Sequence, residues 1–430
     1  MCNFLNQPAL VFKFGGASVK DAAGVKNLQH ILQQFNDKHL FVVISAMGKT
    51  TNLLEKILDA YFYQKEDISP LFLQLKEYHL NIAHELTENN ARIISKLDSV
   101  FKQLEDKLSQ PHSDNYEFEY DQIVSFGEIL STKLISTYLN VTGTRNHWLD
   151  ARTMLITDET YTEARINWEI SEKALKTGIE TANKNHEETL FITQGFIAGT
   201  NNQTATTFGR EGSDYSAAII AYLLDAESVT IWKDVPGLLN ADPKYFPDAV
   251  KLDAISYEEA IELSYYGATV IHPKTLKPLQ NKGIPLYIRP FLDFNAPGSV
   301  ITTAGNDEKI PSYIFKRDQI LLTIFPKDFS FINVENLSEI FNILSQNGMK
   351  INLMQNTALS LSICTDNKPH HLVKVLQQLG RKFTVKYNEK MELVTIRHYT
   401  DETITKVLGD SEIYAEQRSR TTVQMVVKPK

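Results

Sequence analysis

Short apolar runs alternate with longer stretches of mixed apolar and polar residues between residues 9 and 290. The apolar runs predict strands at 9–14, 40–45, 190–194, 228–232 and 285–288. The mixed stretches have apolar residues at helical spacing and predict helices at 22–35, over most of 52–110, and at 120–139, 214–224, 256–265 and 273–281. This alternation predicts an α/β fold with a mainly parallel sheet sandwiched by helices.

The pattern changes after residues 292–312, which are rich in Gly, Pro, Asn and Asp and which we interpret as a linker. Beyond it, strands are predicted at 319–325, 350–355, 358–364, 382–387, 392–397, 411–416 and 422–427, and helices at 336–347, 369–379 and 401–408. Their order is close to two copies of a ferredoxin-like β-α-β-β unit. We therefore predict two domain regions, residues 8–291 and residues 313–430.

Composition narrows the classes of function. The chain has 430 residues and a formal net charge of −8, so no overall positive charge favours nucleic acid or an anionic membrane surface. No apolar run approaches the roughly 18 residues of a membrane span, and the first residues lack the features of a secretory signal. Two cysteines are too few for a disulfide framework or, by themselves, for a four-ligand zinc site, which favours a reducing, cytoplasmic compartment.

The first predicted strand ends in the sequence Lys13-Phe14-Gly15-Gly16-Ala17-Ser18, before a predicted helix. Two glycines let the backbone approach a phosphate closely, and the N-terminus of the following helix adds partial positive charge. Lys13 could reach the same phosphate. The alternative is a tight turn with an exposed lysine, and the motif alone favours neither interpretation.

A second turn, Ser45-Ala46-Met47-Gly48-Lys49-Thr50-Thr51-Asn52, follows the strand at 40–45. It contains Gly-Lys-Thr, but a P-loop needs a glycine where Val43 stands, so we reject a P-loop. Two interpretations stay open. The loop faces a ligand at the carboxyl end of the strand, or Thr50 or Thr51 is a plain helix N-cap.

The densest cluster of polar residues and glycines is residues 206–214, TTFGREGSD. Arg210 could hold a carboxylate with two hydrogen bonds. Asp214, taken alone, is better explained as a capping residue in the first turn of a helix. The two threonines and two glycines beside it are not expected from capping, which favours a ligand site.

Three further positions are candidates. Glu128 follows a glycine inside an apolar helix, where glycine costs about 1 kcal/mol relative to alanine, so close approach of a ligand would explain the glycine. A solvent-facing Glu128 is the alternative. Asp234 could meet a nucleotide or close an Asx-turn. His272 precedes a proline and is interpreted as a residue that starts a helix rather than as a catalytic base.

The motifs occur in a specific order along the chain: KFGGAS, SAMGKTTN, FGE, TQGF, TTFGREGSD, WKDVPG, ADPK and YYGATVIHPKT. The ordered set resembles the aspartate kinases of the amino acid kinase superfamily, which carry C-terminal ACT regulatory domains, and it covers nearly the whole chain. The resemblance implies an amino acid kinase fold followed by two ACT units. It also implies ATP-dependent phosphorylation of the β-carboxylate of L-aspartate to 4-phospho-L-aspartate, the first step toward lysine, threonine and methionine.

The resemblance implies roles for individual residues. Lys13 would bridge the transferred phosphoryl group, and Asp214 would orient Lys13. The substrate ammonium would pair with Glu128 and its α-carboxylate with Arg210. The residues implied in aspartate binding are Ser45, Thr51, Glu128 and Arg210. Those implied in ATP binding are Lys13, Gly15, Gly16, Lys233, Asp234, Leu239, Lys244 and Thr269. An amino-acid effector would contact Met349 and Asn352.

The chemistry of this reaction fits the residues available. The β-carboxylate nucleophile is already ionised at pH 7, so no general base is needed. The obstacle is to bring two anions together, which a lysine, backbone N–H groups and Mg²⁺ address. Mg²⁺ keeps its waters and few protein ligands, so we expect it to arrive with ATP and expect no protein metal site.

Several positions depart from the usual family pattern: Ala17 for threonine, Lys233 for threonine, Leu239 for an aromatic residue, Thr269 for lysine and Asn352 for aspartate. Ala17 and Thr269 motivate an alternative, a catalytically silent amino-acid sensor that acts through its ACT pair. A sister kinase for glutamate, N-acetylglutamate or uridylate is a further alternative, against which the ACT region and the long helical segment argue. The ACT region also predicts a homodimer.

Overall fold

The chain forms two compact units, which are described separately. The structure is a computed structural model that describes residues 4–88, 90–184, 189–268, 271–305, 309–328 and 330–429. The first unit comprises Met1–Leu238, Asp253–Ala260 and Ile271–Gly305, and the second comprises Leu239–Leu252, Ile261–Val270 and Asn306–Lys430. None of the helices in the described ranges is both long and apolar enough to cross a membrane.

An eight-stranded sheet forms the centre of the first unit. Its order is β11-β13-β12-β8-β1-β2-β5-β3, and every neighbouring pair is parallel except β12 and β13. The strands are β1 (Ala9–Phe14), β2 (His39–Ile44), β3 (His147–Trp148), β5 (Leu190–Gln194), β8 (Ser228–Lys233), β11 (Ala254–Ser256), β12 (Leu286–Pro290) and β13 (Ser299–Thr302). The predicted mainly parallel sheet is confirmed.

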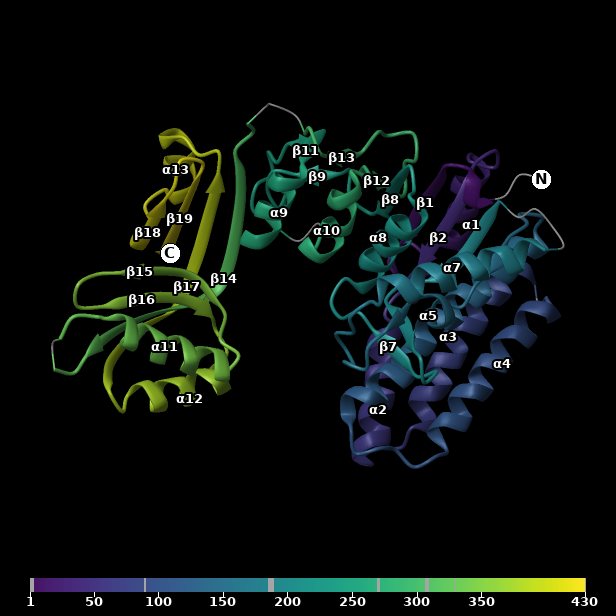
Figure 1. The fold of residues 1–430 in the computed structure, drawn as a ribbon, viewed down its shortest axis with the longest axis horizontal. Coiled ribbons are helices and arrows are strands. Elements are labelled where there is room, and N and C mark those ends of the chain that lie inside the picture. Colours follow the sequence, from purple (N-terminus) through teal and green to yellow (C-terminus); the bar gives the residue numbers. More distant parts are fainter. Residues whose placement is uncertain are drawn as a thin grey trace. The chain divides into compact units, whose positions relative to one another are not determined.

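Helices cover both faces of this sheet. Val11 and Phe12 of β1 are 0% and 2% exposed, and successive strand residues point to opposite faces, so neither face is open. One group of helices packs around α5, and α8 packs with α7 and α10 (Figure 1). The helices are α1 (Ala22–Gln33), α2 (Thr50–Tyr63), α3 (Ser69–Thr87), α4 (Ala91–Leu108), α5 (Tyr116–Val141), α6 (Ala151–Met154), α7 (Trp168–Asn183), α8 (Gly212–Leu224) and α10 (Pro273–Lys282).

Several short elements were not predicted. The interpretation of residues 292–312 as a linker is wrong in part, because β13 lies inside this range and its Ile301 is fully buried in the sheet. Its four residues are flanked by turn-forming residues, which hid the strand. Also unpredicted are α7 and a small three-stranded sheet of order β4-β6-β7, with β4 (Ile156–Thr157), β6 (Ile197–Thr200) and β7 (Ala205–Thr207).

The second unit is built on one six-stranded antiparallel sheet, of order β15-β16-β14-β17-β19-β18. Its elements are β14 (Ser312–Pro326), α11 (Val334–Gln346), β15 (Ile351–Asn356), β16 (Leu361–Asp366), α12 (Pro369–Leu379), β17 (Phe383–Arg397), α13 (Asp401–Leu408), β18 (Glu412–Arg418) and β19 (Thr422–Lys428). This antiparallel region is consistent with ACT domains. Strand β9 (Leu238–Leu239) and helix α9 (Tyr257–Tyr266) each cross a boundary between the two units in sequence, and β10 (Lys251–Leu252) belongs to the second unit.

Two strands of this sheet are longer than predicted. The separate strands expected at 382–387 and 392–397 are one strand, β17, and β14 begins at Ser312 rather than at 319. Polar residues around Lys390, which has a left-handed φ of 58°, look like a turn in the sequence. Both halves of β17 nevertheless pair with β14, and register shifts near Gln319 absorb the irregularity.

Candidate active site

A cavity of about 610 Å³ opens at the carboxyl edge of the parallel sheet, where β1, β2 and β8 end and α8 begins. This edge is where open α/β sheets bind their ligands. The cavity brings together eight of the residues that the sequence predicted: Lys13, Gly16, Ser45, Thr51, Glu128, Arg210, Asp214 and Lys233.

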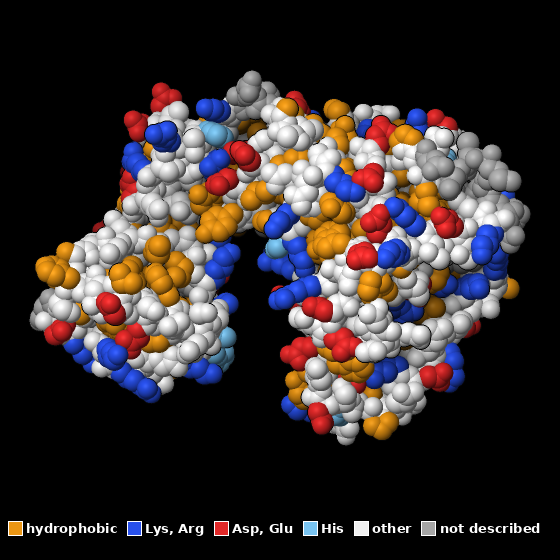
Figure 2. Space-filling view, viewed as in Figure 1, with side chains coloured by type: hydrophobic (Ala, Val, Ile, Leu, Met, Phe, Trp, Pro, Cys, Tyr) orange, Lys and Arg blue, Asp and Glu red, His pale blue; other side chains and the backbone are white. Residues whose placement is uncertain are grey.

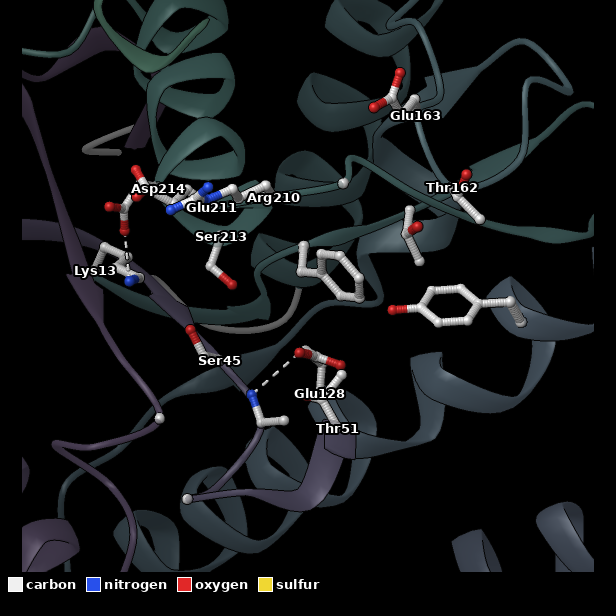
Figure 3. Close-up of a pocket in the computed structure, with 18 of the residues that line it drawn as sticks. Lys13, Ser45, Thr51, Glu128, Thr162, Glu163, Arg210, Glu211, Ser213 and Asp214 are labelled. Carbon is white, nitrogen blue, oxygen red and sulfur yellow. Dashed lines mark hydrogen bonds and ion pairs between the residues drawn. The ribbon is translucent and has the colours of Figure 1, made fainter. Parts of the chain in front are cut away.

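Two lysines share one buried carboxylate in this cavity. The Lys13 Nζ lies 2.5 Å from Asp214 Oδ1, and the Lys233 Nζ lies 3.4 Å from Asp214 Oδ2 (Figure 3 shows the Lys13 pair). Burial would raise the pKa of the Asp214 carboxyl, but the Coulombic attraction of both ammonium groups outweighs burial and lowers it. Two cations on one anion leave an excess of positive charge, which suits a phosphate group.

The glycine turn after β1 is shaped by close backbone packing. A Cβ on Gly16 would lie 2.5 Å from the Ala46 carbonyl oxygen, and the Gly48 N–H donates to the Gly16 carbonyl at 3.0 Å. Only glycine fits there, so the loops after β1 and β2 lie against each other at the cavity. Gly15 lies beside the Lys13 ammonium, since a Cβ built on Gly15 would lie 3.5 Å from the Lys13 Nζ.

That the helix after this turn supplies positive charge stays a prediction, and none of its residues lines the cavity. Helix α1 begins at Ala22, and its N-cap Asp21 already accepts a hydrogen bond from the Gly24 N–H at 2.8 Å. The first turn of α8 lines the cavity instead, through Gly212 and Ser213. The N–H groups of Gly212 and Asp214 already donate to the Gly209 and Glu211 carbonyls, at 3.0 and 3.1 Å. The contribution of α8 to the positive end of the site is therefore its helix dipole, whose N-terminal end favours anions.

The capping interpretations of both threonine and aspartate motifs are wrong. Lys49 is the N-cap of α2 without a side-chain bond, and the Thr50 hydroxyl donates to the Met47 carbonyl at 2.6 Å. Thr51 lines the cavity. The N-cap of α8 is Glu211, and the Asp214 side chain is engaged by lysines rather than by backbone N–H groups.

Glu128 lies in the same cavity and has no ion-pair partner in the described part of the chain. It is 3% exposed, so the solvent-facing alternative is wrong. Its Oε1 accepts a hydrogen bond from the Ala46 N–H at 3.3 Å, and its Oε2 is buried without a hydrogen-bond partner among the described residues (Figure 3). Burial raises the pKa of Glu128 to about 8. A ligand that brings a cation to Oε2 would relieve this unfavourable environment.

Gly127 serves packing rather than the ligand. A Cβ on Gly127 would lie 3.1 Å from the Ala46 Cβ and 3.2 Å from the Leu54 Cδ1. The glycine therefore allows α5 to lie close to the β2–α2 turn. The predicted ligand approach at Gly127 is wrong, but the close packing places the neighbouring Glu128 against the Ala46 N–H.

Arg210 lies on the loop between β7 and α8 and is exposed where this loop borders the cavity. It has no carboxylate partner within ion-pair distance in the part of the chain that the structure describes. A guanidinium group in this setting is available to bind a carboxylate of a ligand with two hydrogen bonds.

The cavity also contains residues that sequence reasoning missed: Tyr120, Thr162, Glu163, Phe196 and Thr207. Phe196 and Thr207 belong to the motifs TQGF and TTFGREGSD but were assigned no role, whereas Tyr120, Thr162 and Glu163 lie outside every motif and gave no signal. Phe196 and Thr162 have left-handed φ angles of 67° and 68°, which are unfavourable for side chains of this kind. Such strained residues concentrate at functional sites.

The residues implied in nucleotide binding are placed differently. Asp234 is exposed immediately after Lys233. Leu239 and Lys244 belong to the second compact unit. Thr269 lies outside the described residues. His272 is the N-cap of α10, where its side chain accepts from the Lys274 N–H, so its interpretation as a residue that starts a helix is confirmed.

The two residues implied in effector binding lie in the second unit. Met349 is buried in the apolar cluster beneath α11 and α12. The Asn352 side chain accepts a hydrogen bond from the Lys316 Nζ at 3.0 Å and donates to Gln319 and Asp366, each at 2.8 Å. Their contact with an effector stays a prediction.

The fold and the cavity define an α/β protein whose cavity holds two lysines on a buried aspartate, together with a buried glutamate and an exposed arginine. Comparison with protein families matches residues 8–290 to the "Amino acid kinase family". The chain belongs to this family.

Curated relatives and solved structures extend the comparison. The chain is 29% identical to Aspartokinase 2, chloroplastic, of Arabidopsis thaliana, over 90% of this chain and 73% of that protein. It is 30% identical to Aspartokinase 3, chloroplastic, of the same plant, over 86% and 68%. It covers only 42% of a plant bifunctional aspartokinase/homoserine dehydrogenase. The structure of E. coli aspartokinase III in complex with lysine and aspartate matches with a TM-score of 0.80 and 25% identity, over 98% of this chain and 96% of that chain.

Proposed function

We propose that this chain is an aspartate kinase, which transfers the γ-phosphoryl group of ATP to the β-carboxylate of L-aspartate and forms 4-phospho-L-aspartate. The observation that carries the proposal is one cavity with two differently charged ends. Lys13, Asp214 and Lys233 form a cationic end, and Glu128 and Arg210 offer one group for an ammonium and one for a carboxylate. Two curated relatives are named aspartokinases, which supports aspartate as the substrate.

The substrate end of the cavity orients aspartate through two of its charged groups, the α-ammonium and the α-carboxylate. The Glu128 carboxylate binds the α-ammonium, and the Arg210 guanidinium binds the α-carboxylate, while Ser45 and Thr51 line the space between. Fixing both groups directs the third, the β-carboxylate, toward Lys13. Holding two reactants in this way is a major source of rate enhancement.

In the chemical step, a β-carboxylate oxygen forms a bond to Pγ while the bond from Pγ to the bridging oxygen breaks and ADP leaves. The nucleophile is ionised at neutral pH, so no proton has to be removed. Lys13 neutralises charge on the transferred group, and Asp214 holds the Lys13 ammonium in place. Backbone N–H groups of Gly15 and Gly16 donate to the phosphate oxygens.

The nucleotide is held by further residues in this proposal. Lys233 replaces the threonine common in this family and adds a second cation beside Asp214. Asp234, Leu239, Lys244 and Thr269 complete the ATP site. The described residues contain no group of three or more His, Cys, Asp or Glu side chains that could hold a metal ion. Mg²⁺ prefers phosphate oxygens and water, so it is carried by ATP and neutralises the phosphates when bound.

The proposed domains are the kinase domain at 8–291 and the paired ACT domains at 313–430. We also propose a homodimer through the ACT region. Strand β15 lies at the edge of its sheet, and Figure 2 shows hydrophobic side chains gathered over β15 and β16. Met354 and Leu359 are 51% and 46% exposed. A second copy would cover this edge. Light scattering that finds only monomer at micromolar concentration would argue against it.

Two finer parts of the proposal concern regulation and location. An amino-acid effector acts through the ACT region, and a screen of lysine, threonine and methionine against activity identifies it. E. coli aspartokinase III, to which this chain is similar, has been solved in complex with lysine and aspartate. The scarcity of cysteine supports a cytoplasmic location.

A coupled assay of ADP release tests the proposed reaction. We expect turnover that depends on both aspartate and ATP, that Lys13→Ala abolishes, and that glutamate does not support. No aspartate-dependent turnover, together with calorimetric binding of an amino acid but not of ATP, would instead indicate a silent sensor. Turnover with glutamate in place of aspartate would indicate a sister kinase.

A further inference from the structure

Asp121 is a buried carboxylate with no evident role in phosphoryl transfer. It lies on α5, seven residues before Glu128, and is 0% exposed. Among the residues that the structure describes, no cation lies within ion-pair distance of it. Burying an ionised carboxylate without a counterion is costly unless hydrogen bonds compensate. The partners of the hydrogen bonds of Asp121 therefore indicate its role.

Within the described ranges, the Asp121 side chain makes three hydrogen bonds, all to two residues that line the cavity. Its Oδ2 accepts from the Thr162 N–H and from the Thr207 N–H, both at 2.9 Å, and its Oδ1 accepts from the Thr207 hydroxyl at 2.7 Å. Burial raises the pKa of Asp121 to about 6, against the effect of these bonds, so the group is ionised at neutral pH and acts only as an acceptor.

The two residues that Asp121 holds come from segments far apart in the sequence. Thr207 also bonds to a residue close to Thr162, since the Ala164 N–H donates to the Thr207 carbonyl at 2.9 Å. Thr162 has a left-handed φ of 68°, a conformation that is unfavourable for a β-branched residue and persists only when its surroundings enforce it. The hydrogen bond from its N–H to Asp121 is one such constraint.

The segment that contains Thr207 continues directly into the loop that carries Arg210. The chain turns from Thr207 to Arg210 through Gly209, whose φ is 72° and where a Cβ would lie 3.0 Å from the Thr162 carbonyl oxygen. The loop is thus packed tightly on the residue that Asp121 holds. Thr162 and Arg210 both border the cavity, and Thr162 lies across it from Lys13 (Figure 3).

We propose that Asp121 is a positioning residue for the aspartate end of the site: it fixes Thr162 and Thr207 against each other and so sets where Arg210 meets the substrate carboxylate. The inference rests on the proposed function. Asp121 acts through the loop and does not touch substrate, so its loss changes aspartate binding while the Lys13 end keeps its geometry.

Steady-state kinetics of Asp121→Ala in the full chain test this role. We expect the KM for aspartate to rise about tenfold or more, and the KM for ATP to stay within about twofold, as for a lost substrate contact. KM does not depend on the fraction of folded enzyme, so a merely structural role would not produce this split. An unchanged KM for aspartate, or equal rises in both KM values, would overturn the proposal.

Two further variants sharpen the test. Asp121→Asn can place its carbonyl oxygen at the two N–H groups and its NH₂ group at the Thr207 hydroxyl, so we expect the KM for aspartate within about threefold of the unaltered chain. Gln122→Ala is the matched control from the same helix. Among the described residues, the Gln122 side chain bonds to backbone groups that do not line the cavity: those of Ala205, at 2.8 and 3.0 Å, and the Phe118 carbonyl, at 3.3 Å. It should lower thermal stability without raising the KM for aspartate.

The outcomes separate this inference from the function beneath it. Should Asp121→Ala fail to fold, Asp121→Glu replaces it, since the extra methylene displaces the carboxylate, and the same selective rise in KM is expected. A Gln122→Ala variant with the kinetics of the Asp121 variant would overturn the role of Asp121. No aspartate-dependent turnover by the unaltered chain would reject the proposed function itself.

Discussion

Two acids in one cavity are equally buried and have opposite surroundings. Asp214 and Glu128 are each 3% exposed. Asp214 has the ammonium groups of Lys13 and Lys233 at 2.5 and 3.4 Å, which lower its pKa despite burial. Glu128 has one N–H at 3.3 Å, and burial raises its pKa to about 8.

The difference teaches which end of the cavity is complete and which end is built for a ligand. The carboxylate of Asp214 is compensated by the chain itself, so its role is to hold lysines. Glu128 lacks that compensation within the described residues, and a substrate ammonium would supply it. A buried acid therefore preorganises the lysines at one end of the cavity, and another buried acid recognises the substrate ammonium at the other end.

The largest expected effect comes from removing a lysine at the end of the cavity where the charge of Asp214 is compensated. Lys13→Ala removes the cation nearest the transferred phosphoryl group and leaves Asp214 with one lysine. We expect kcat to fall by about 10³-fold or more, measured by coupled ADP release. Lys20→Ala, an exposed lysine close by in the sequence, is the control and should keep full activity. Retention of more than about a tenth of kcat by Lys13→Ala would contradict its assigned role.

At the uncompensated end, Glu128→Gln should raise the KM for aspartate by about 100-fold, since truncating one partner of a buried charge pair costs several kcal/mol. The KM for ATP should change little. Glu163→Gln, which also alters a cavity-lining glutamate, is the matched control and should keep its KM within about threefold. Equal effects of the two substitutions would show that Glu128 has no special contact with aspartate.

A substitution at Lys233 separates the contributions of the two lysines that contact Asp214. Lys233→Thr restores the residue common in this family and keeps the closer Lys13 pair. We expect a rise of about tenfold in the KM for ATP with a smaller change in kcat, because a partly exposed cation contributes less than a buried one. A rise in the KM for aspartate instead would move Lys233 to the substrate end.

The pKa of Glu128 gives a pH dependence with a definite sign. Below about pH 8 the empty site holds the protonated acid, which cannot pair with an ammonium. Aspartate binding must then displace the proton, so the KM for aspartate should fall by up to about tenfold per pH unit between pH 6 and 8. Glu128→Gln should flatten this profile. A profile that is equally steep in the variant would assign the titration to another group.

The smallest expected effect is on stability. The pKa of Glu128 is about 8 in the folded chain and about 4.3 when unfolded. Between these values the folded state holds a proton that the unfolded state releases, so stability falls as pH rises. Glu128→Gln removes this loss and should raise Tm by about 3 °C or more at pH 8.5, with little change at pH 5. An equal shift of Tm at both pH values would mean that packing, rather than charge, is responsible.

Local sequence patterns were sufficient to predict five strands of the eight-stranded sheet, β1, β2, β5, β8 and β12, and the loops at its edge, but not β3, β11 and β13. The strands of the parallel sheet are apolar on both faces, and the turns after β1 and β2 contain glycines that close packing requires, as Gly16 against the Ala46 carbonyl shows. Parallel strands bring their carboxyl ends to one edge, so Lys13, Ser45 and Lys233 could be expected together from the sequence.

Other features depend on contacts between distant residues and were beyond local patterns. Asp214 looks like a capping residue until Lys13, some 200 positions earlier, is placed beside it. Thr162 and Asp121 belong to no motif, since their importance comes from a hydrogen bond across 41 positions. The length of β17 likewise depended on β14, because pairing between strands carried it through a polar stretch.

The uncompensated state of Glu128 is tested most directly by counting the protons released when aspartate binds. Isothermal titration calorimetry at pH 7 in two buffers of different ionisation enthalpy gives this number. With a pKa of about 8, Glu128 starts protonated, so the unaltered chain should release about one proton per aspartate and Glu128→Gln should release none. No release by the unaltered chain, or equal release by both, would contradict the account.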